Sequence, residues 1–160
     1  MKPVRLAICV NPMSGRDVRR LAARATNMTH EAKRDTVARV AAGAEAVGVT
    51  DIYIAREPFR IATLALEYMN LKARVHVIEH PLTNGAADTE AAMAAYLEAG
   101  CDTVVSLGGD GTNRAITRAA PDVNLVALST GTNNVFPQLL EPTIGEALQG
   151  APCLGRGIRR

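Results

Sequence analysis

The sequence predicts a doubly wound α/β domain with a mostly parallel β-sheet, and three observations support this fold class. Short runs of β-branched and aliphatic residues recur along the 160-residue chain. Segments with apolar residues at helical spacing separate these runs. Clusters rich in Gly, Asn, Ser and Thr directly follow three of the runs. Strands that alternate with helices form parallel sheets with right-handed crossovers and helices on both faces.

The strands are expected to be buried on both faces, because each run is continuously apolar rather than alternating. The first run is too short for a membrane span or a signal sequence, which leaves a strand as its interpretation. The expected strands are Val4–Val10, Asp51–Ala55, Arg74–Ile78, Thr103–Leu107 and Asn124–Leu128.

Helices are expected between the strands and after the last one. The Ala-rich segment before Gly100 has high helix propensity, and the glycine marks its end. Pro121 ends the helix that follows the fourth strand. The expected helices lie within residues 17–25, 37–47, 61–71, 86–99, 112–120 and 143–149.

Composition excludes several classes of function. Hydrophobic residues make up 48% and charged residues 21% of the chain, and the net charge is only +2. Because basic residues form no stripe interleaved with aromatics, we expect no nucleic-acid partner, and no membrane partner either. Cys9, Cys101 and Cys153 have no CxxC spacing, which argues against disulfides and zinc and favours the reducing cytoplasm. Cys101 is expected to be buried packing.

The three polar clusters are the most informative feature of the sequence. They are Asn11–Gly15 after the first strand, Gly108–Thr112 after the fourth and Ser129–Asn134 after the fifth. Since parallel strands all end at one edge of their sheet, these clusters are expected to meet there. Open α/β sheets bind ligands at this edge, near the point where the strand order reverses.

Gly108–Thr112 has the composition of a phosphate-binding turn. Its glycines allow positive φ angles and close approach of the main chain, so that successive amides can face an anion near a helix N-terminus. A carboxylate beside phosphate is unfavourable unless it has a purpose, so Asp110 is expected to take a proton or hold Mg²⁺. The alternative is a tight turn in which Asp110 caps the helix.

The other two clusters leave alternatives open. Asn11–Gly15 is either a nucleotide-phosphate loop or a plain turn with Ser14 as the helix cap. Ser129–Asn134 suits hydrogen bonding to ribose, base or phosphate, or forms a polar surface loop. The sequence has no Walker A loop, no G-x-G-x-x-G after the first strand and no G-x-S-x-G. These absences argue against a P-loop protein, a dehydrogenase and an α/β-hydrolase.

Two further residues lie near the same edge. His80 ends the third strand and is expected to be an ordinary loop histidine, with substrate contact as the alternative. Asp88 begins the next helix and is expected to favour its positive N-terminus, with a second carboxylate facing the cleft as the alternative.

Gly108–Thr112 resembles the GGDGT signature shared by NAD kinases, diacylglycerol and sphingosine-type lipid kinases and, as GGDG, phosphofructokinases. Asn11-Pro12-x-Ser14-Gly15 and Gly131-Thr132-x-Asn134 resemble the same superfamily. The likeness is closest to ATP-NAD kinase-like proteins of the AcoX type, on residues 11–20, 80–89 and 107–137, and it covers most of the chain.

The resemblance implies transfer of phosphate from ATP, with Mg²⁺, to a nucleotide hydroxyl, with NAD as a possible substrate. It implies that Asp110 is the catalytic base toward a ribose hydroxyl, while no protein-only metal site is expected. The residues expected to bind nucleotide are Asn11, Ser14, Gly15, Gly108, Gly109, Gly111, Thr112, Thr130, Gly131, Thr132, Asn133 and Asn134.

Two departures from the family pattern shape the remaining expectations. Lipid kinases carry Asn-Asp where this chain has Asn133-Asn134, which weakens a lipid-kinase function. Family members continue into a second, largely β domain, which we expect to be missing from residues 1–160. We therefore expect a nucleotide-binding domain over 1–141 and a helix and tail over 142–160. For the assembly, we expect either a partner subunit that supplies the second domain or a homo-oligomer. For the function, the alternative to a kinase is a non-catalytic domain that binds nucleotide for sensing or assembly.

Overall fold

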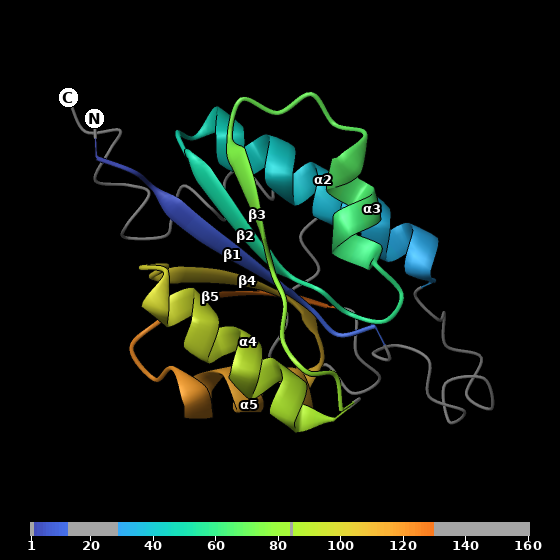
Figure 1. Cartoon of the computed structure of the whole chain (residues 1–160), viewed down its shortest axis with the longest axis vertical. Helices are drawn as coiled ribbons and strands as arrows, with labels where there is room; N and C mark the ends of the chain where they lie inside the picture. The colour runs from blue at the N-terminus through green and yellow to red at the C-terminus, as the bar shows by residue number, and fades with distance from the viewer. Residues whose placement is uncertain (1, 13–28, 84, 130–160) are drawn as a thin grey trace.

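The computed structural model of the chain describes residues 2–12, 29–83 and 85–129 (Figure 1). Strands and helices alternate along these residues, as the sequence predicts. In chain order they are β1 (Arg5–Val10), α2 (His30–Ala46), β2 (Asp51–Ala55), α3 (Ile61–Glu67), β3 (Arg74–Ile78), α4 (Ala86–Glu98), β4 (Thr103–Gly108), α5 (Asp110–Ala119) and β5 (Asn124–Ser129).

The strands form one sheet in the order β3-β2-β1-β4-β5. Every neighbouring pair is parallel, with Leu6 opposite Ile52 on one side and Thr103 on the other. The chain builds outward from β1 to β3 and then crosses back to place β4 on the other side of β1. This order confirms the doubly wound α/β prediction and puts the switch point between β1 and β4.

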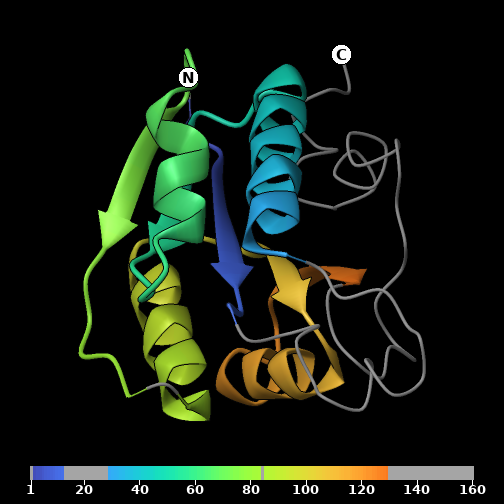
Figure 2. The ribbon, with the colours of Figure 1, turned by 90° about the vertical axis from the view of Figure 1, so that its right-hand side faces the viewer.

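Helices cover both faces of the sheet (Figures 1 and 2). Leu6 and Ile8 of β1 join the core beneath α2 and α3, whereas Ala7 and Cys9 join the core beneath α4 and α5. Successive strand residues point to opposite faces, so one apolar strand serves both cores. This double burial explains why β1 is apolar at consecutive positions.

The edge strand β3 corrects the expectation that all strands are buried on both faces. Val75 is 37% and Val77 is 46% exposed, because β3 pairs with β2 alone. Its valines are typical of a strand, and His76 between them interrupts the apolar run that a strand buried on both faces would have.

The boundaries around the glycine-rich motif also differ from expectation. β4 extends through Gly108 and α5 begins at Asp110, two residues before the predicted start at Thr112. A carboxylate in the first turn is favoured by the positive end of the helix dipole, which is consistent with the earlier start. The motif is thus a strand end joined directly to a helix start.

The helices expected within residues 17–25 and 143–149, and the boundary at 141–142, lie outside the described residues. Within the part of the chain that the structure describes, no helix has both the length and the apolar character needed to cross a membrane.

Candidate functional site

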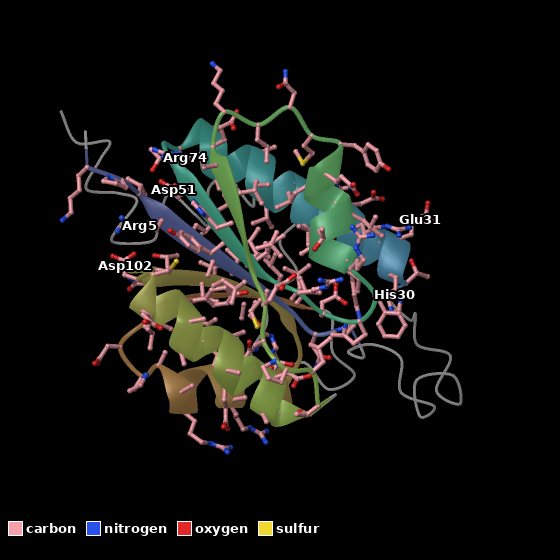
Figure 3. The ribbon with its side chains drawn as sticks, in the orientation of Figure 1. Arg5, His30, Glu31, Asp51, Arg74 and Asp102 are labelled. Atoms are coloured by element: carbon pink, nitrogen blue, oxygen red, sulfur yellow. The ribbon has the colours of Figure 1, made fainter. Side chains whose placement is uncertain are left out.

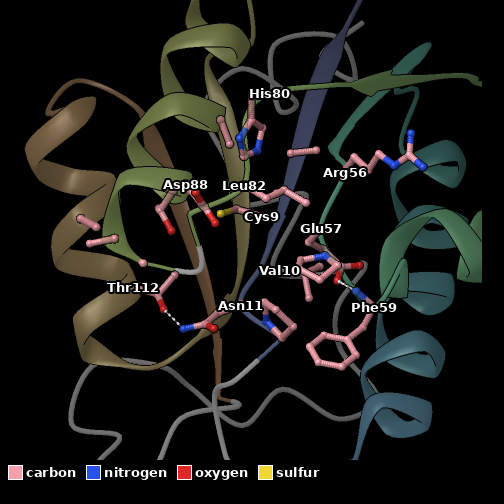
Figure 4. Close-up of a pocket in the computed structure, with 18 of the residues that line it drawn as sticks. Cys9, Val10, Asn11, Arg56, Glu57, Phe59, His80, Leu82, Asp88 and Thr112 are labelled. Atoms are coloured by element: carbon pink, nitrogen blue, oxygen red, sulfur yellow. Dashed lines mark hydrogen bonds between the residues drawn. The ribbon is translucent and has the colours of Figure 1, made fainter.

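A cavity of about 740 Å³ lies at the carboxyl edge, the edge of the sheet at which the parallel strands end (Figure 4). Its walls come from the ends of β1 and β2, the segments that follow β2 and β3, one side of α4 and the start of α5. The volume is typical of cofactor and small-molecule sites. The fold therefore places a ligand-sized space beside the β1/β4 switch point.

Two of the three polar clusters meet at this cavity. The Asn11 Nδ2 donates a hydrogen bond of 2.9 Å to the Thr112 Oγ1, although the residues are 101 positions apart (Figure 4). The Asn11 backbone N–H donates to the Leu107 carbonyl at 2.9 Å, which extends the β1/β4 pairing beyond the strand end. Asn11 and Thr112 both line the cavity.

Glycine is present at different positions of the motif for different structural reasons. A Cβ on Gly108 would lie 2.6 Å from the Cβ of Thr112, so this glycine makes room for the threonine side chain. A Cβ on Gly111 would meet no atom within 4 Å, and Gly111 lines the cavity. Gly108, Gly109 and Gly111 do not use the positive φ that glycine allows: Gly109 has a φ of −103°, and the glycines with positive φ among the described residues are Gly48 and Gly100.

Asp110 lies in the first turn of α5 and is half-buried. The helix cap is Gly109, which makes no side-chain cap bond, so the alternative in which Asp110 caps the helix is not what the structure adopts. Asp110 is not among the residues that line the cavity, whereas Gly111 and Thr112 are. Its carboxylate therefore lies beside the cavity rather than in its wall.

The segment after β3 contributes His80 to the cavity wall, and the first turn of α4 contributes Asp88 (Figure 4). The Asp88 Oδ1 accepts hydrogen bonds of 2.7 Å from the backbone N–H and the hydroxyl of Thr83. Asp88 thus lies in the first turn of α4, as expected, and also lines the cleft. The His80 Nδ1 lies 3.0 Å from the carbonyl oxygen of Pro81.

The inner wall is apolar and includes Cys9 and Tyr96, which the sequence analysis did not assign to a site. Burial raises the pKa of the Cys9 thiol to about 12, so the thiol stays protonated at neutral pH. The buried Tyr96 hydroxyl donates to the Ile8 carbonyl at 3.1 Å, and burial raises its pKa. Cys101 is buried as expected, and burial raises its pKa to about 12.

The segment between β2 and α3 forms the opposite wall. The buried Glu57 carboxylate accepts the backbone N–H of Phe59 at 2.8 Å and that of Ile61, which opens α3. A carboxylate at this position satisfies helix-end donors and favours the helix dipole. Glu57 and Phe59 line the cavity, and the Phe59 side chain is 44% exposed.

Lys33 of α2 is a further residue near the site that the sequence did not predict. Its Nζ donates to the carbonyl oxygens of Asn11 at 3.1 Å and Pro12 at 2.9 Å, and the residue is 0% exposed. A signal for it exists in the sequence: Lys33 stands on the buried stripe of α2, at helical spacing from Val37 and Ala41.

The described residues hold no group of three or more His, Cys, Asp or Glu side chains that could bind a metal ion. Mg²⁺ in nucleotide sites is usually held by one or two carboxylates together with phosphate oxygens. Asp110 fits that limited requirement, because it supplies one carboxylate at the start of α5. The expected nucleotide-binding residues Ser14, Gly15, Thr130, Gly131, Thr132, Asn133 and Asn134 lie outside the described residues.

Fold and cavity together define a doubly wound α/β protein with a ligand-sized cavity at the carboxyl edge, lined in part by a GGDGT motif. A family model described as the ATP-NAD kinase N-terminal domain matches residues 6–151. The chain therefore belongs to the ATP-NAD kinase-like family.

A relative supports this assignment. The chain is 30% identical over 158 residues to the acetoin catabolism protein X of Cupriavidus necator. The match covers 94% of this chain and 44% of the relative, so the chain spans less than half of that protein's length.

Proposed function

We propose that this chain is a kinase-type domain that binds ATP or NAD in the carboxyl-edge cavity and transfers phosphate to a nucleotide hydroxyl. The observation that carries the proposal is the Asn11–Thr112 hydrogen bond, which joins two motifs of the ATP-NAD kinase-like family at the mouth of a cavity of about 740 Å³. Family membership supports the phosphotransferase class, and the cavity supports a small-molecule ligand.

The cavity has two regions that suit the two halves of a nucleotide. Its inner wall, with Cys9, Tyr96 and Ala92, is apolar and suits a base. Its α5 side presents the first turn of a helix, where the backbone N–H groups at a helix start and the helix dipole favour phosphate. Gly111 leaves this turn open to a ligand.

Asp110 is proposed to act on the acceptor hydroxyl or on the metal that accompanies the phosphates. Mg²⁺, when bound, would neutralise charge on the transferred phosphate. Positioning and charge neutralisation account for most catalysis of phosphate transfer, so one carboxylate near the phosphate end of the cavity suffices for this role.

Calorimetric titration of the chain with ATP and with NAD tests the binding half of the proposal. We expect binding in the wild type, and a Thr112→Val variant should bind about tenfold more weakly, equivalent to about 1.4 kcal/mol, because it loses the hydroxyl that Asn11 contacts. Thr117→Val is the matched control: it makes the same change on the same helix at a residue outside the cavity wall. Absence of binding to either nucleotide would refute the proposed function.

Asp110→Asn tests the catalytic half. A general base or metal ligand contributes about 100-fold or more to rate, so transfer from ATP to NAD should fall by at least that factor while nucleotide affinity and melting temperature change little. Equal transfer rates for wild type and variant would exclude both roles of Asp110.

A second candidate is a domain that binds nucleotide without transferring phosphate. It is favoured by the position of Asp110 beside the cavity wall rather than in it. The discriminating result is nucleotide binding that responds to Thr112→Val, together with no phosphate transfer to any tested acceptor hydroxyl.

A further inference from the structure

The ammonium group of Lys33 is buried inside the fold and directed at the segment that follows β1. Lys33 lies in the first turn of α2 and is 0% exposed. Its Nζ donates to two successive carbonyl oxygens, those of Asn11 at 3.1 Å and Pro12 at 2.9 Å. Removing an ammonium group from water is unfavourable unless such partners replace its hydration.

Packing alone does not explain a lysine at this position. The buried residues of α2 are Lys33, Val37, Val40, Ala41 and Ala44, which form one stripe against the sheet. An aliphatic side chain would fill the first position of this stripe without the cost of burying a charge. Local departures from a packing pattern are expected where a residue serves a site.

The contacts of Asn11 link Lys33 to the cavity. The N–H of Asn11 donates to Leu107 of β4, its carbonyl accepts from Lys33, and its side chain donates to Thr112 of α5. The next carbonyl, on Pro12, accepts from Lys33 and also lies 3.1 Å from the His30 Nε2. α2 therefore holds the main chain at residues 11 and 12, and this fixes where the Asn11 side chain can reach.

We propose that Lys33 is a positioning residue of the nucleotide site. By holding the carbonyl oxygens of Asn11 and Pro12, it keeps the Asn11 amide on the Thr112 hydroxyl at the start of α5. Lys33 is absent from the cavity wall, so it acts through Asn11 rather than by touching the ligand. This inference rests on the proposed nucleotide site for its effect on binding, but not for its effect on Asn11.

Lys33→Met tests the inference, since methionine keeps an unbranched apolar side chain and removes the ammonium group. We expect the dissociation constant for ATP to rise about tenfold, by analogy with metal sites, where loss of a residue that orients a ligand lowers affinity by about tenfold or more. In an Asn11→Ala background the same substitution should have no further effect, because its route to the cavity is already lost. Additive effects of the two substitutions would overturn the inference, because they would mean that Lys33 affects binding independently of Asn11.

A structural control separates positioning from loss of stability. Val37→Ala removes packing one turn along the same buried stripe. It should lower the melting temperature while leaving the ATP dissociation constant unchanged. An equal loss of affinity in Val37→Ala and Lys33→Met would show that affinity follows stability, which contradicts a specific role of Lys33.

A measurement without ligand distinguishes failure of this inference from failure of the proposed function. In the NMR spectrum of the free protein, the side-chain amide signals of Asn11 should move in Lys33→Met toward their positions in Thr112→Val, where the hydrogen bond cannot form. Unchanged Asn11 signals would overturn the inference whatever ATP does. If they move as expected and the wild type binds no ATP, the positioning role stands and the nucleotide site is refuted.

Discussion

Within the GGDGT motif, Gly108 and Gly111 have different structural roles. Gly108 is the last residue of a buried strand and faces the Thr112 side chain one helical turn ahead, at a separation that leaves no room for a methyl group. Gly111 lies in the first turn of α5 beside open space at the cavity. One glycine is needed for packing, and the other leaves access to the helix N-terminus.

Alanine substitutions should separate these two roles. Gly108→Ala should lower the free energy of unfolding by about 1–3 kcal/mol, because Thr112 must move out of its position. Gly111→Ala should leave stability unchanged or raise it by up to about 1 kcal/mol, because alanine is the better helix former. Urea unfolding measures both values.

The same two variants also bear on the cavity. Gly111→Ala should weaken ATP binding although the fold is intact, because its methyl group would occupy the mouth of the cavity. Full ATP affinity in Gly111→Ala would show that ligands do not approach the start of α5.

Helix ends in this chain are set by conformations that single residues adopt. α2 stops at Ala46 and the chain turns through Gly48 with φ of +101°, while α4 stops before Gly100 with φ of +87°. Left-handed backbone is unstrained only for glycine. At the start of α3 the same region is occupied by Arg60, with φ of 52°, where the Glu57 carboxylate holds the turn.

Gly48→Ala isolates the cost of the backbone conformation at the end of α2. A Cβ there would meet nothing within 4 Å, so steric contact plays no part. The free energy of unfolding should fall by about 1–2 kcal/mol, the cost of placing a side chain in left-handed backbone. Gly111→Ala, at a helical position without positive φ, is the control in the same urea titration; equal effects of the two substitutions would contradict the conformational explanation.

At the scale of the whole molecule, charge is arranged differently at the two edges of the sheet. Asp51, Arg74, Arg5 and Asp102 lie near the ends at which the strands begin, far from His30 on the side of the carboxyl edge (Figure 3). The buried Asp51 carboxylate contacts His76 at 2.8 Å, the Thr50 hydroxyl at 2.7 Å and Arg74 at 3.7 Å. These contacts tie β2 to the edge strand β3.

The Asp51 contacts give a pH dependence of stability. Hydrogen bonds from His76 and Thr50, and then the charge of Arg74, lower the pKa of Asp51 below its usual value. A carboxyl whose pKa is depressed on folding stabilises the protein fully above the unfolded pKa of about 3.9, and this stabilisation is lost as pH falls through the folded pKa. We expect the urea midpoint to fall from about pH 5 downward, in the range set by these two pKa values.

Asp51→Asn tests this assignment. The variant should be less stable than the wild type at pH 7, because the charged hydrogen bonds at β2 and β3 are weakened, and the difference should shrink toward pH 3. A constant difference between the two proteins across that range would show that Asp51 does not contribute to acid unfolding.

Within the described residues, the sequence alone predicted which segments form strands and helices, though not all of their boundaries, and where the motifs lie. All five strands were predicted from their short runs of β-branched and aliphatic residues, and the end of α4 from Gly100, because strand and helix formation depends on local spacing and backbone preference. The placement of two polar clusters at one edge was also predicted, since it follows from the direction of parallel strands.

Strand order, the cavity and the role of Lys33 depended on the tertiary structure. Whether a strand is central or at an edge is decided by packing between elements, which is why the valines of β3 are exposed although they are typical of a strand. The contact between Asn11 and Thr112 joins residues 101 positions apart, and the carbonyl oxygens that accept from Lys33 belong to the main chain and carry no side-chain signature. Local spacing determines which elements form, whereas the contacts that build a site arise only when those elements pack.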